Sequence, residues 1–367
     1  MKISLVIYAL FIALFGCAQF HTLTLPEASP AVSIKHQIGV TTLTINFHSP
    51  SVKGRDVWNN PNVIPQKGDP IAWRAGANEN TTISFDTDVF IEGQPLKAGS
   101  YGFHIIPDGH KHTLIFAQPD NLWGSYYLDI EKDAVLKVNV SDSASAFTEN
   151  LSYSLIQRTQ NTGTIALLWG NRMIPFKVSV DLNKTTVEKL RYELNGENTY
   201  HWQAWNDAAL WCLQHNTNLE EALTWTNRSI KGGYGGFAAH NSFINLSTKI
   251  ELLDALGKSE ELEATIATIF EMEFSADEAH YMGATLLRLK MDKEALKLMN
   301  TGLDKHENDW GMLLFKGVSL HYLGETKKAQ KTLKTCSFHC PEWFKPRLES
   351  IQNEMTSGTY NYPNRKA

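Results

Sequence analysis

The sequence predicts a two-domain protein in which an antiparallel β-sandwich or jelly-roll-like domain is followed by an all-α helical repeat array. Residues 29–181 are filled by short apolar runs that alternate with a period of two and are separated by turn residues. Residues 186–355 contain amphipathic runs with helical spacing, and these runs recur at a fixed interval. The length of 367 residues fits two domains of ordinary size.

The N-terminal residues 1–18 have the layout of a secretory signal peptide. One lysine precedes an apolar run over residues 3–15, and small residues follow the run. The letters GCA fit cleavage after Ala18, whereas LFGC fits a bacterial lipobox, in which Cys17 would carry lipid. Both alternatives predict an exported protein, periplasmic, outer-membrane-associated or secreted, with membrane contact only through this segment.

The pattern of predicted β-strands extends from about Ile34 to Val180. In TLTINF, the apolar Leu43, Ile45 and Phe47 alternate with polar residues, as expected for a strand with one buried face. Gly, Pro, Asn and Asp supply the turns between the runs. The other predicted strands are TTISF, SYGFHII, HTLIFAQ, AVLKVNV, LSYSLIQ, GTIALLW and MIPFKVSV. Some eight or nine strands, with no helix between them, predict an antiparallel sandwich or jelly roll.

The helical half contains an internal repeat. The segments LLDALGKSEELEA, LLRLKMDKEALKL and LHYLGETKKAQKT align on Gly257, Lys290 and Gly324. The spacing of about 33 to 34 residues is the period of tetratricopeptide repeats, in which each repeat is an antiparallel helix pair. About four pairs are predicted, stacked into a short array because one helical hairpin cannot bury its own apolar face. The array would either bind a protein partner or support the β domain.

Two features lie near the C-terminus. Residues 356–367 are predicted to be a polar tail. Cys336 and Cys340, in CSFHCPEW, favour a disulfide that closes a helix end. Free thiols are one alternative, and half of a zinc site that includes His339 is another.

Composition and motifs exclude several function classes. The net charge of -5 argues against a nucleic-acid partner, which would require a basic surface. The sequence has no phosphate loop, G-x-S-x-G elbow or H-E-x-x-H motif, and no cofactor is predicted. His104, His110 and His112 flank one turn, and alternation could bring His104 and His112 onto neighbouring positions, but no Asp or His partner at fixed spacing completes a metal site, so none is predicted.

The polar residues best suited to ligand binding or catalysis lie before the TTISF run or at its first position. They are Arg55, Trp73, Arg74, Asn78, Glu79 and Thr81. Arginine binds carboxylate or phosphate in a bidentate manner, and tryptophan stacks on a sugar or covers a cation. These side chains would hold a small polar or anionic ligand at the mouth of the sandwich. The alternative is structural: arginine and glutamate pair with each other and with backbone carbonyls, while Trp73 covers the core.

A further aromatic group occurs in NLWGSYYL. Trp123 and Tyr126 would suit a carbohydrate platform, because they lie beside a glycine after a short loop. Inward-facing core aromatics are the alternative for this segment.

Several separated motifs resemble those of one family. The segments SPSVKGR, WRAGANENTTISF, IEGQPLKAGSYGFHIIP, HTLIF and WGSYY are similar in content and order to the domain-of-unknown-function family DUF2911, over about Ser29 to Val180. The resemblance implies a secreted protein of the Bacteroidetes type, with a helical repeat region after the domain in some relatives. Residues 70–72 replace the usual V-P-Y-G, which would reshape a pocket rim. His112 replaces a usual Trp, which weakens a metal-binding interpretation.

Three functions are compatible with these residues. The leading hypothesis is a non-enzymatic binding module for a small polar, anionic or carbohydrate ligand, joined to an array that recruits a protein partner. The first alternative is a hydrolase or lyase in which Glu79 is the base while Arg55 and Arg74 stabilise charge. The second alternative is a structural scaffold. The enzyme requires Glu79 in a cleft with an unpaired carboxylate, and the binding module requires the tryptophan and arginine to be exposed without such a base. The scaffold requires these side chains to be saturated internally.

Overall fold

The computed structural model describes residues 25–69 and 71–366. The chain divides into two compact units, with the boundary between Thr185 and Thr186. The predicted signal peptide and the lipidation candidate Cys17 lie outside the described residues. Within the described ranges, no helix has the length and apolar character needed to cross a membrane.

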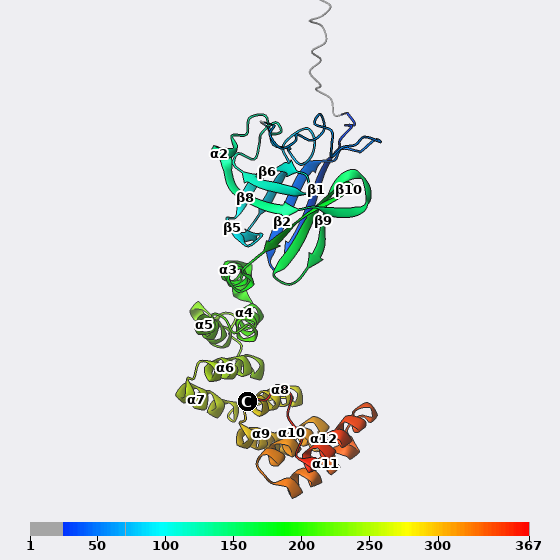
Figure 1. Ribbon diagram of the computed structural model, residues 1–367. Helices are drawn as coiled ribbons and strands as arrows, with labels where there is room; N and C mark the ends of the chain where they lie inside the picture. The colour runs from blue at the N-terminus through cyan, green and yellow to red at the C-terminus, as the bar shows by residue number, and fades with distance from the viewer. Residues whose placement is uncertain (1–24, 70, 367) are drawn as a thin grey trace, which may run out of the picture. The chain divides into compact units, whose positions relative to one another are not determined.

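The first unit is built from two antiparallel sheets (Figure 1). The six-stranded sheet has the order β1 (Ala31–Ile38), β2 (Thr41–His48), β3 (Thr82–Phe85), β6 (Gly99–Asp108), β7 (Lys111–Ala117) and β8 (Ala134–Ser141). The four-stranded sheet has the order β5 (Gln94–Leu96), β4 (Val89–Ile91), β10 (Thr162–Ser179) and β9 (Ser143–Arg158). A short helix, α2 (Ile130–Asp133), precedes β8. The predicted fold class of this half is confirmed.

Strand alternation places one apolar core between the two sheets. In β2 the side chains of Leu43, Ile45 and Phe47 are buried, and their neighbours are half-buried or exposed. Phe103 of β6 and Phe176 of β10 come from different sheets, and their ring centroids are 5.6 Å apart. Contact across the core therefore joins the sheets as a sandwich.

A long connection, residues 49–81, joins β2 to β3 and carries most of the predicted site residues. Its middle is fixed to the six-stranded sheet, because Trp73 and Ile105 exchange two backbone hydrogen bonds of 2.8 Å. Its start is fixed to β9, where the Ser49 hydroxyl donates to the Leu151 carbonyl at 2.7 Å. These bonds give a segment without regular structure a defined path over the sandwich.

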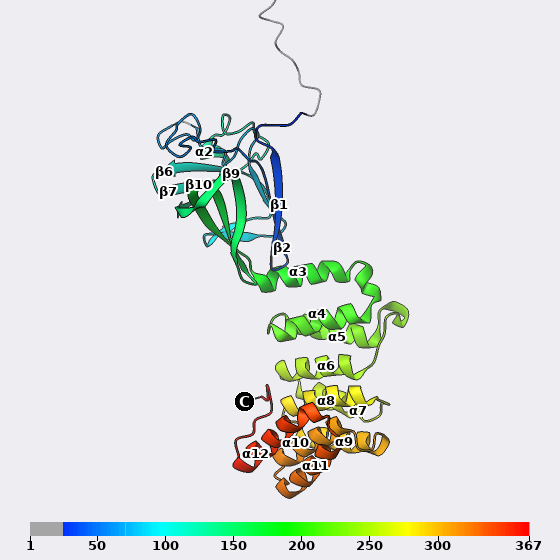
Figure 2. The same cartoon turned by 90° about the vertical axis from the view of Figure 1, so that its right-hand side faces the viewer.

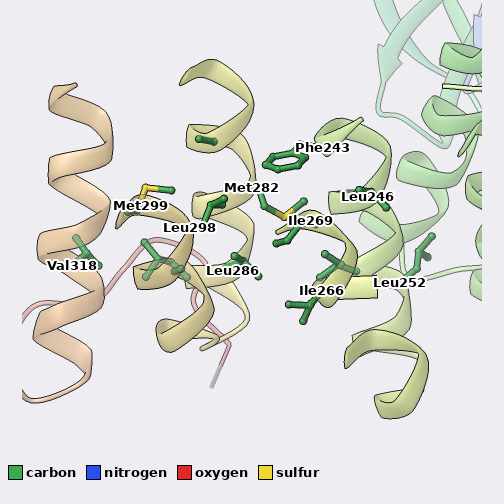
Figure 3. Packing of buried hydrophobic residues seen from close by; sticks show 14 of the residues in the cluster. Phe243, Leu246, Leu252, Ile266, Ile269, Met282, Leu286, Leu298, Met299 and Val318 are labelled. Atoms are coloured by element: carbon green, nitrogen blue, oxygen red, sulfur yellow. The ribbon is translucent and has the colours of Figure 1, made fainter. Parts of the chain in front are cut away.

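The second unit is an array of antiparallel helix pairs (Figure 2). The pairs are α4 (Trp202–Gln214) with α5 (Leu219–Lys231), α6 (Phe243–Ala255) with α7 (Ser259–Ile269), α8 (Ala276–Arg288) with α9 (Asp292–Lys305), and α10 (Trp310–Tyr322) with α11 (Thr326–His339). The helices α3 (Leu182–Leu194) and α12 (Lys345–Ser357), which the sequence pattern did not predict, precede and follow them. Phe243, Met282, Leu286 and Met299 illustrate the continuous apolar core between successive pairs (Figure 3).

The aligned repeat positions share one backbone conformation. Gly257, Lys290 and Gly324 have φ values of 68°, 62° and 78°, and each lies in the turn between the two helices of a pair. A left-handed residue at this point ends the first helix and lets the second fold back against it. The observed spacing of the repeat therefore has a direct structural cause, and the prediction of a tetratricopeptide-like array is confirmed.

The expected disulfide between Cys336 and Cys340 is not formed, and both thiols are free and buried. Cys336 lies in α11 and Cys340 is its C-cap residue. Residues one helical turn apart hold their β-carbons about 5–6 Å apart, whereas a disulfide requires about 3.8 Å. The Cys336 thiol instead donates to the Trp310 carbonyl at 3.2 Å, and burial raises its pKa to about 12.

Candidate functional site

An open cavity of about 870 Å³ lies where the residue 49–81 connection meets the segment after β7 and the strand β10. Its charged and aromatic lining residues are Lys53, Arg55, Asp69, Trp73, Arg74, Tyr126 and Trp169. Five of the predicted site residues line this cavity: Arg55, Trp73, Arg74, Asn78 and Tyr126.

Trp73 forms the inner wall of the cavity and also belongs to the core. Its side chain is only 2% exposed. Its ring stacks on Trp169 at 6.0 Å with an interplanar angle of 13°, and it meets Trp58 edge-on at 5.8 Å. The Trp58 indole N–H donates to the Trp169 carbonyl at 2.9 Å. Trp73 therefore covers the core, as the structural alternative predicted. Its packing with Trp58 and Trp169 gives the cavity a rigid base.

Arg74 is held in place by neutral partners. Its guanidinium donates to the Asn78 carbonyl and lies 5.2 Å from the ring centroid of Tyr126. Gly124 faces the guanidinium on a third side, where no β-carbon intervenes. A cation held by a carbonyl and a π face keeps its full charge available to an anion.

Arg55 is fixed in a similar way by its own turn. Its side chain donates to the Val52 carbonyl at 3.0 Å and to the Ser51 carbonyl at 2.6 Å. Among the described residues, no carboxylate forms an ion pair with Arg55, Arg74 or Lys53. Asp69 is the one acidic residue among the described lining residues. The cavity therefore carries an excess of positive charge.

Asn78 and Thr81 hold the connection in shape. Asn78 has a left-handed backbone, with φ of 55°, and its amide donates to the Glu27 carboxylate at 3.1 Å. Thr81 is fully buried, and its hydroxyl donates to the Ala75 carbonyl at 3.2 Å. The Tyr153 hydroxyl donates to the same carbonyl at 2.7 Å. Thr81 therefore supports the site without lining it.

Glu79 does not join the arginines. Its carboxylate lies 3.2 Å from Nδ1 of His48 and its side chain is 54% exposed. Glu79 and His48 line a separate hollow of about 530 Å³, to which neither Arg55 nor Arg74 contributes. The positive φ values of Ala75 and Asn78 redirect the chain between Arg74 and Glu79. The grouping of Glu79 with Arg55 and Arg74, on which the hydrolase or lyase alternative depends, is therefore not found in the structure.

The two predicted aromatic candidates differ in position. Tyr126 is 60% exposed and lines the cavity. Trp123 is 58% exposed but is not among the residues that line it. Tyr126 is therefore the aromatic side chain that a ligand in the cavity would contact.

His104 and Ser125 form a buried pair that sequence reasoning did not anticipate. Nδ1 of His104 lies 2.7 Å from the Ser125 hydroxyl, and Ser125 lines the cavity. Burial, assisted by the nearby Arg74 charge, lowers the pKa of His104 to about 4. Both faces of β6 are buried along this stretch, so alternation gave no signal for the pair. The imidazole is neutral at pH 7 and adds no charge to the site.

A second histidine group surrounds Asp142 and is distinct from His104. The buried carboxylate of Asp142 contacts His110 at 2.7 Å, His112 at 3.1 Å and Arg172 at 3.2 Å. These contacts lower the pKa of Asp142 against the opposing effect of burial, which is the largest single influence. Within the described part of the chain, no group of three or more His, Cys, Asp or Glu side chains is arranged to hold a metal ion. The network instead fixes the β7–β8 edge.

The fold and the site define a two-domain protein: an antiparallel β-sandwich with a cation-lined cavity, followed by a tetratricopeptide-like helical array. Residues 29–178, which include the strands of the β-sandwich, match the model of a family described as "Protein of unknown function (DUF2911)". No curated protein matches the chain.

Three solved structures are similar to the chain at low identity. The MamA RS-1 ArsTM double mutant is 14% identical, with a TM-score of 0.31, over 45% of this chain and 88% of that one. YrrB, described as a TPR protein with an unusual peptide-binding site, is 14% identical, with a TM-score of 0.30, over 49% and 87%. A TPR-domain-containing protein from Parabacteroides distasonis ATCC 8503 is 10% identical, with a TM-score of 0.27, over 91% and 76%.

Proposed function

We propose that the β-sandwich domain is a non-enzymatic module that binds a small anionic ligand in the cavity beneath Arg55 and Arg74. The observation that carries the proposal is the charge of the lining. Lys53, Arg55 and Arg74 contribute cations, and Asp69 is the one acidic residue among the described lining residues. A carboxylate or phosphate would supply the opposite charge that the surrounding residues do not provide.

The positions of the arginines suit recognition of an anion. Each guanidinium is oriented by bonds to backbone carbonyls, so little side-chain entropy is lost when a ligand binds. Arg74 is half-buried, and a partly desolvated cation attracts an anion more strongly than a fully solvated one. The Tyr126 ring beside Arg74 would pack against the apolar part of an organic acid or a sugar phosphate.

The hydrolase or lyase alternative has weaker support. A general base must come within hydrogen-bonding distance of the proton that it removes. A ligand held by Arg55 and Arg74 lies in a different cavity from Glu79, whose carboxylate is mostly exposed and contacts His48. We therefore assign Glu79 no catalytic role in the proposal.

The proposal is tested by thermal-shift measurements of the full chain against organic acids, sugar phosphates, inorganic phosphate and matched neutral sugars. A ligand that binds only the folded state raises the melting temperature. The proposal expects a shift with anions that weakens as salt is added, because the lining charges are partly exposed. Equal shifts with the neutral sugars would contradict the charge-based recognition.

We also propose that the helical array binds a protein partner. Phe338, near the end of α11, and Trp343, in the 3-10 segment Glu342–Phe344, expose 74% and 75% of their surfaces. Exposed aromatic side chains are enriched at protein interfaces. The sequence features of residues 1–18 support a further proposal, that the protein is exported before it acts.

A further inference from the structure

The C-terminal residues 359–366 do not extend into solvent but lie against the helical array. Figure 2 shows this segment running back from α12 beside α10 and α8. Tyr360 is only 9% exposed, and the Tyr362 N–H donates to the Tyr322 hydroxyl at 2.7 Å. The Arg365 N–H then donates to the Tyr362 carbonyl at 3.1 Å, closing a turn over Pro363 and Asn364. Of the predicted polar tail, residues 356–357 belong to α12 and residues 359–366 form an ordered peptide.

Arg365 occupies a specific position at the end of α8. Its guanidinium binds both carboxylate oxygens of Asp292, at 2.8 and 2.7 Å, and donates to the Leu287 carbonyl at 2.7 Å. It also lies 3.5 Å from the ring centroid of Tyr322. Only 9% of the Arg365 side chain is exposed. Such a cation, enclosed by a carboxylate, a carbonyl and an aromatic ring, has the surroundings of a bound ligand group.

Lys366 extends the contact to the next helix pair. Its backbone N–H donates to the Arg288 carbonyl at 2.8 Å, and its ammonium binds the Asp254 carboxylate at 2.9 and 3.0 Å. Leu287 and Arg288 are at the end of α8, where the backbone carbonyls carry partial negative charge, although the Leu287 carbonyl also accepts from the N–H groups of Leu289 and Lys290. Asp254 near the end of α6 adds a full negative charge at another helix C-terminus, where a cation is favoured.

We propose that this edge of the array, defined by Asp254, Leu287, Arg288, Asp292 and Tyr322 and here called the tail track, is a binding site for a basic, tyrosine-containing peptide of a partner protein. In the free protein the chain's own residues 359–366 fill the tail track and must leave before the partner binds. The charge complementarity argues for this occupant, because two carboxylates and two helix-end carbonyls face one Arg-Lys pair. The inference rests on the proposed interaction role of the array and is independent of the anion cavity.

The test measures binding of a labelled synthetic peptide with the sequence of residues 358–367 to three forms of the full chain. The released form carries Arg365→Ala and Lys366→Ala. A matched control carries Lys345→Ala and Arg347→Ala, which remove two cations from α12 that pair outside the tail track. The released form should bind the peptide at least tenfold more tightly than the wild type and the control. Equal binding by all three forms would overturn the proposal.

Two further variants locate the contact on the array. Asp292→Asn in the released form should weaken peptide binding at least tenfold, and a peptide with Glu in place of Arg and Lys should not bind. Loss of binding in Trp343→Ala but not in Asp292→Asn would reject the tail track. That result would still leave a partner site at the α11–α12 end, so the failure of this inference differs from failure of the array's proposed role.

Hydrogen exchange of the wild-type chain provides a measurement that does not depend on the variants. Excess peptide should accelerate exchange of the Tyr362 and Lys366 amides, because both are bonded to the array only while the tail is in place. Unchanged exchange at saturating peptide would show that the tail is a permanent part of the fold and would overturn the proposal. If light scattering shows a wild-type dimer that is lost in the released form, the occupant is a second copy of the chain, and the partner peptide is rejected.

Discussion

A β-carbon placed on Gly124 would lie 2.4 Å from Cζ of Arg74, so the guanidinium occupies the space that any other residue's side chain would need. Gly124 also has φ of 66°, a conformation that residues with a β-carbon rarely adopt. The Arg74 guanidinium is thereby guided to a position beside Tyr126, facing the cavity. Gly124, in the WGSYY motif, thus leaves the space that the Arg74 guanidinium occupies, in addition to adopting a turn conformation.

Gly124→Ala should reduce anion binding at least tenfold, because the new methyl group would displace the Arg74 guanidinium. Its cost in the free energy of unfolding should be about 1 kcal/mol, from the backbone conformation. Gly109→Ala is a matched control, since Gly109 has φ of 61° but open space around it. Equal loss of anion binding in the two variants, measured by calorimetric titration, would contradict this role of Gly124.

Trp73→Ala should lower the free energy of unfolding of the β-sandwich by about 3–5 kcal/mol, the usual cost of removing a large buried aromatic side chain. Trp123→Ala, at a position that is 58% exposed, should change it by less than about 0.5 kcal/mol. Urea denaturation followed by circular dichroism measures both. A mild effect of Trp73→Ala would mean that Trp73 is not the base of the cavity.

Stability should depend on pH through His104. Its pKa is about 4 in the folded protein, below the value of 6.5 for a free imidazole, so the unfolded chain binds the proton first. The resulting stability is complete above about pH 6.5 and is lost as the pH falls toward 4. Between pH 7 and 4.5 the wild type should lose about 2–3 kcal/mol more than His104→Gln. If the free energy of unfolding of the two proteins changes equally with pH, His104 is not the source of the pH dependence.

Lys290→Gly should stabilise the helical array by about 1 kcal/mol, because Lys290 adopts φ of 62° where the equivalent repeats carry glycine. Its side chain is exposed, so little contact is lost. Lys293→Gly, three residues later on the exposed face of α9, should have the opposite effect and destabilise by about 1 kcal/mol. Thermal denaturation measures whether each variant is more or less stable than the wild type. A destabilised Lys290→Gly variant would exclude backbone strain at this turn.

The sequence predicted the repeat array well because its signal is local. The left-handed turn residues Gly257, Lys290 and Gly324 recur at intervals of 33 and 34 residues, and each turn imposes the same packing on its helix pair. The helices α3 and α12 were missed because neither belongs to a repeat. The tail contact of Arg365 with Asp292 was also missed, since the two residues are 73 positions apart.

The site was predictable in its residue types but not in its grouping. Arg55 and Arg74 were identified from their chemistry, and the structure places them around one cavity. Glu79 was grouped with them because it is close in sequence, but the left-handed residues Ala75 and Asn78 turn the chain before it. The position of a side chain in an irregular connection depends on such turns, and periodicity carries no information about them.

The central claim is that Arg74 binds an anion in a cavity that does not include Glu79. It is tested most directly by calorimetric titration of the best anion from the thermal-shift series into the wild type, Arg74→Met and Glu79→Gln. Arg74→Met keeps most of the apolar stem and removes the charge, so binding should fall at least tenfold, whereas Glu79→Gln should bind like the wild type. Unchanged affinity in Arg74→Met, or a loss confined to Glu79→Gln, would contradict the account.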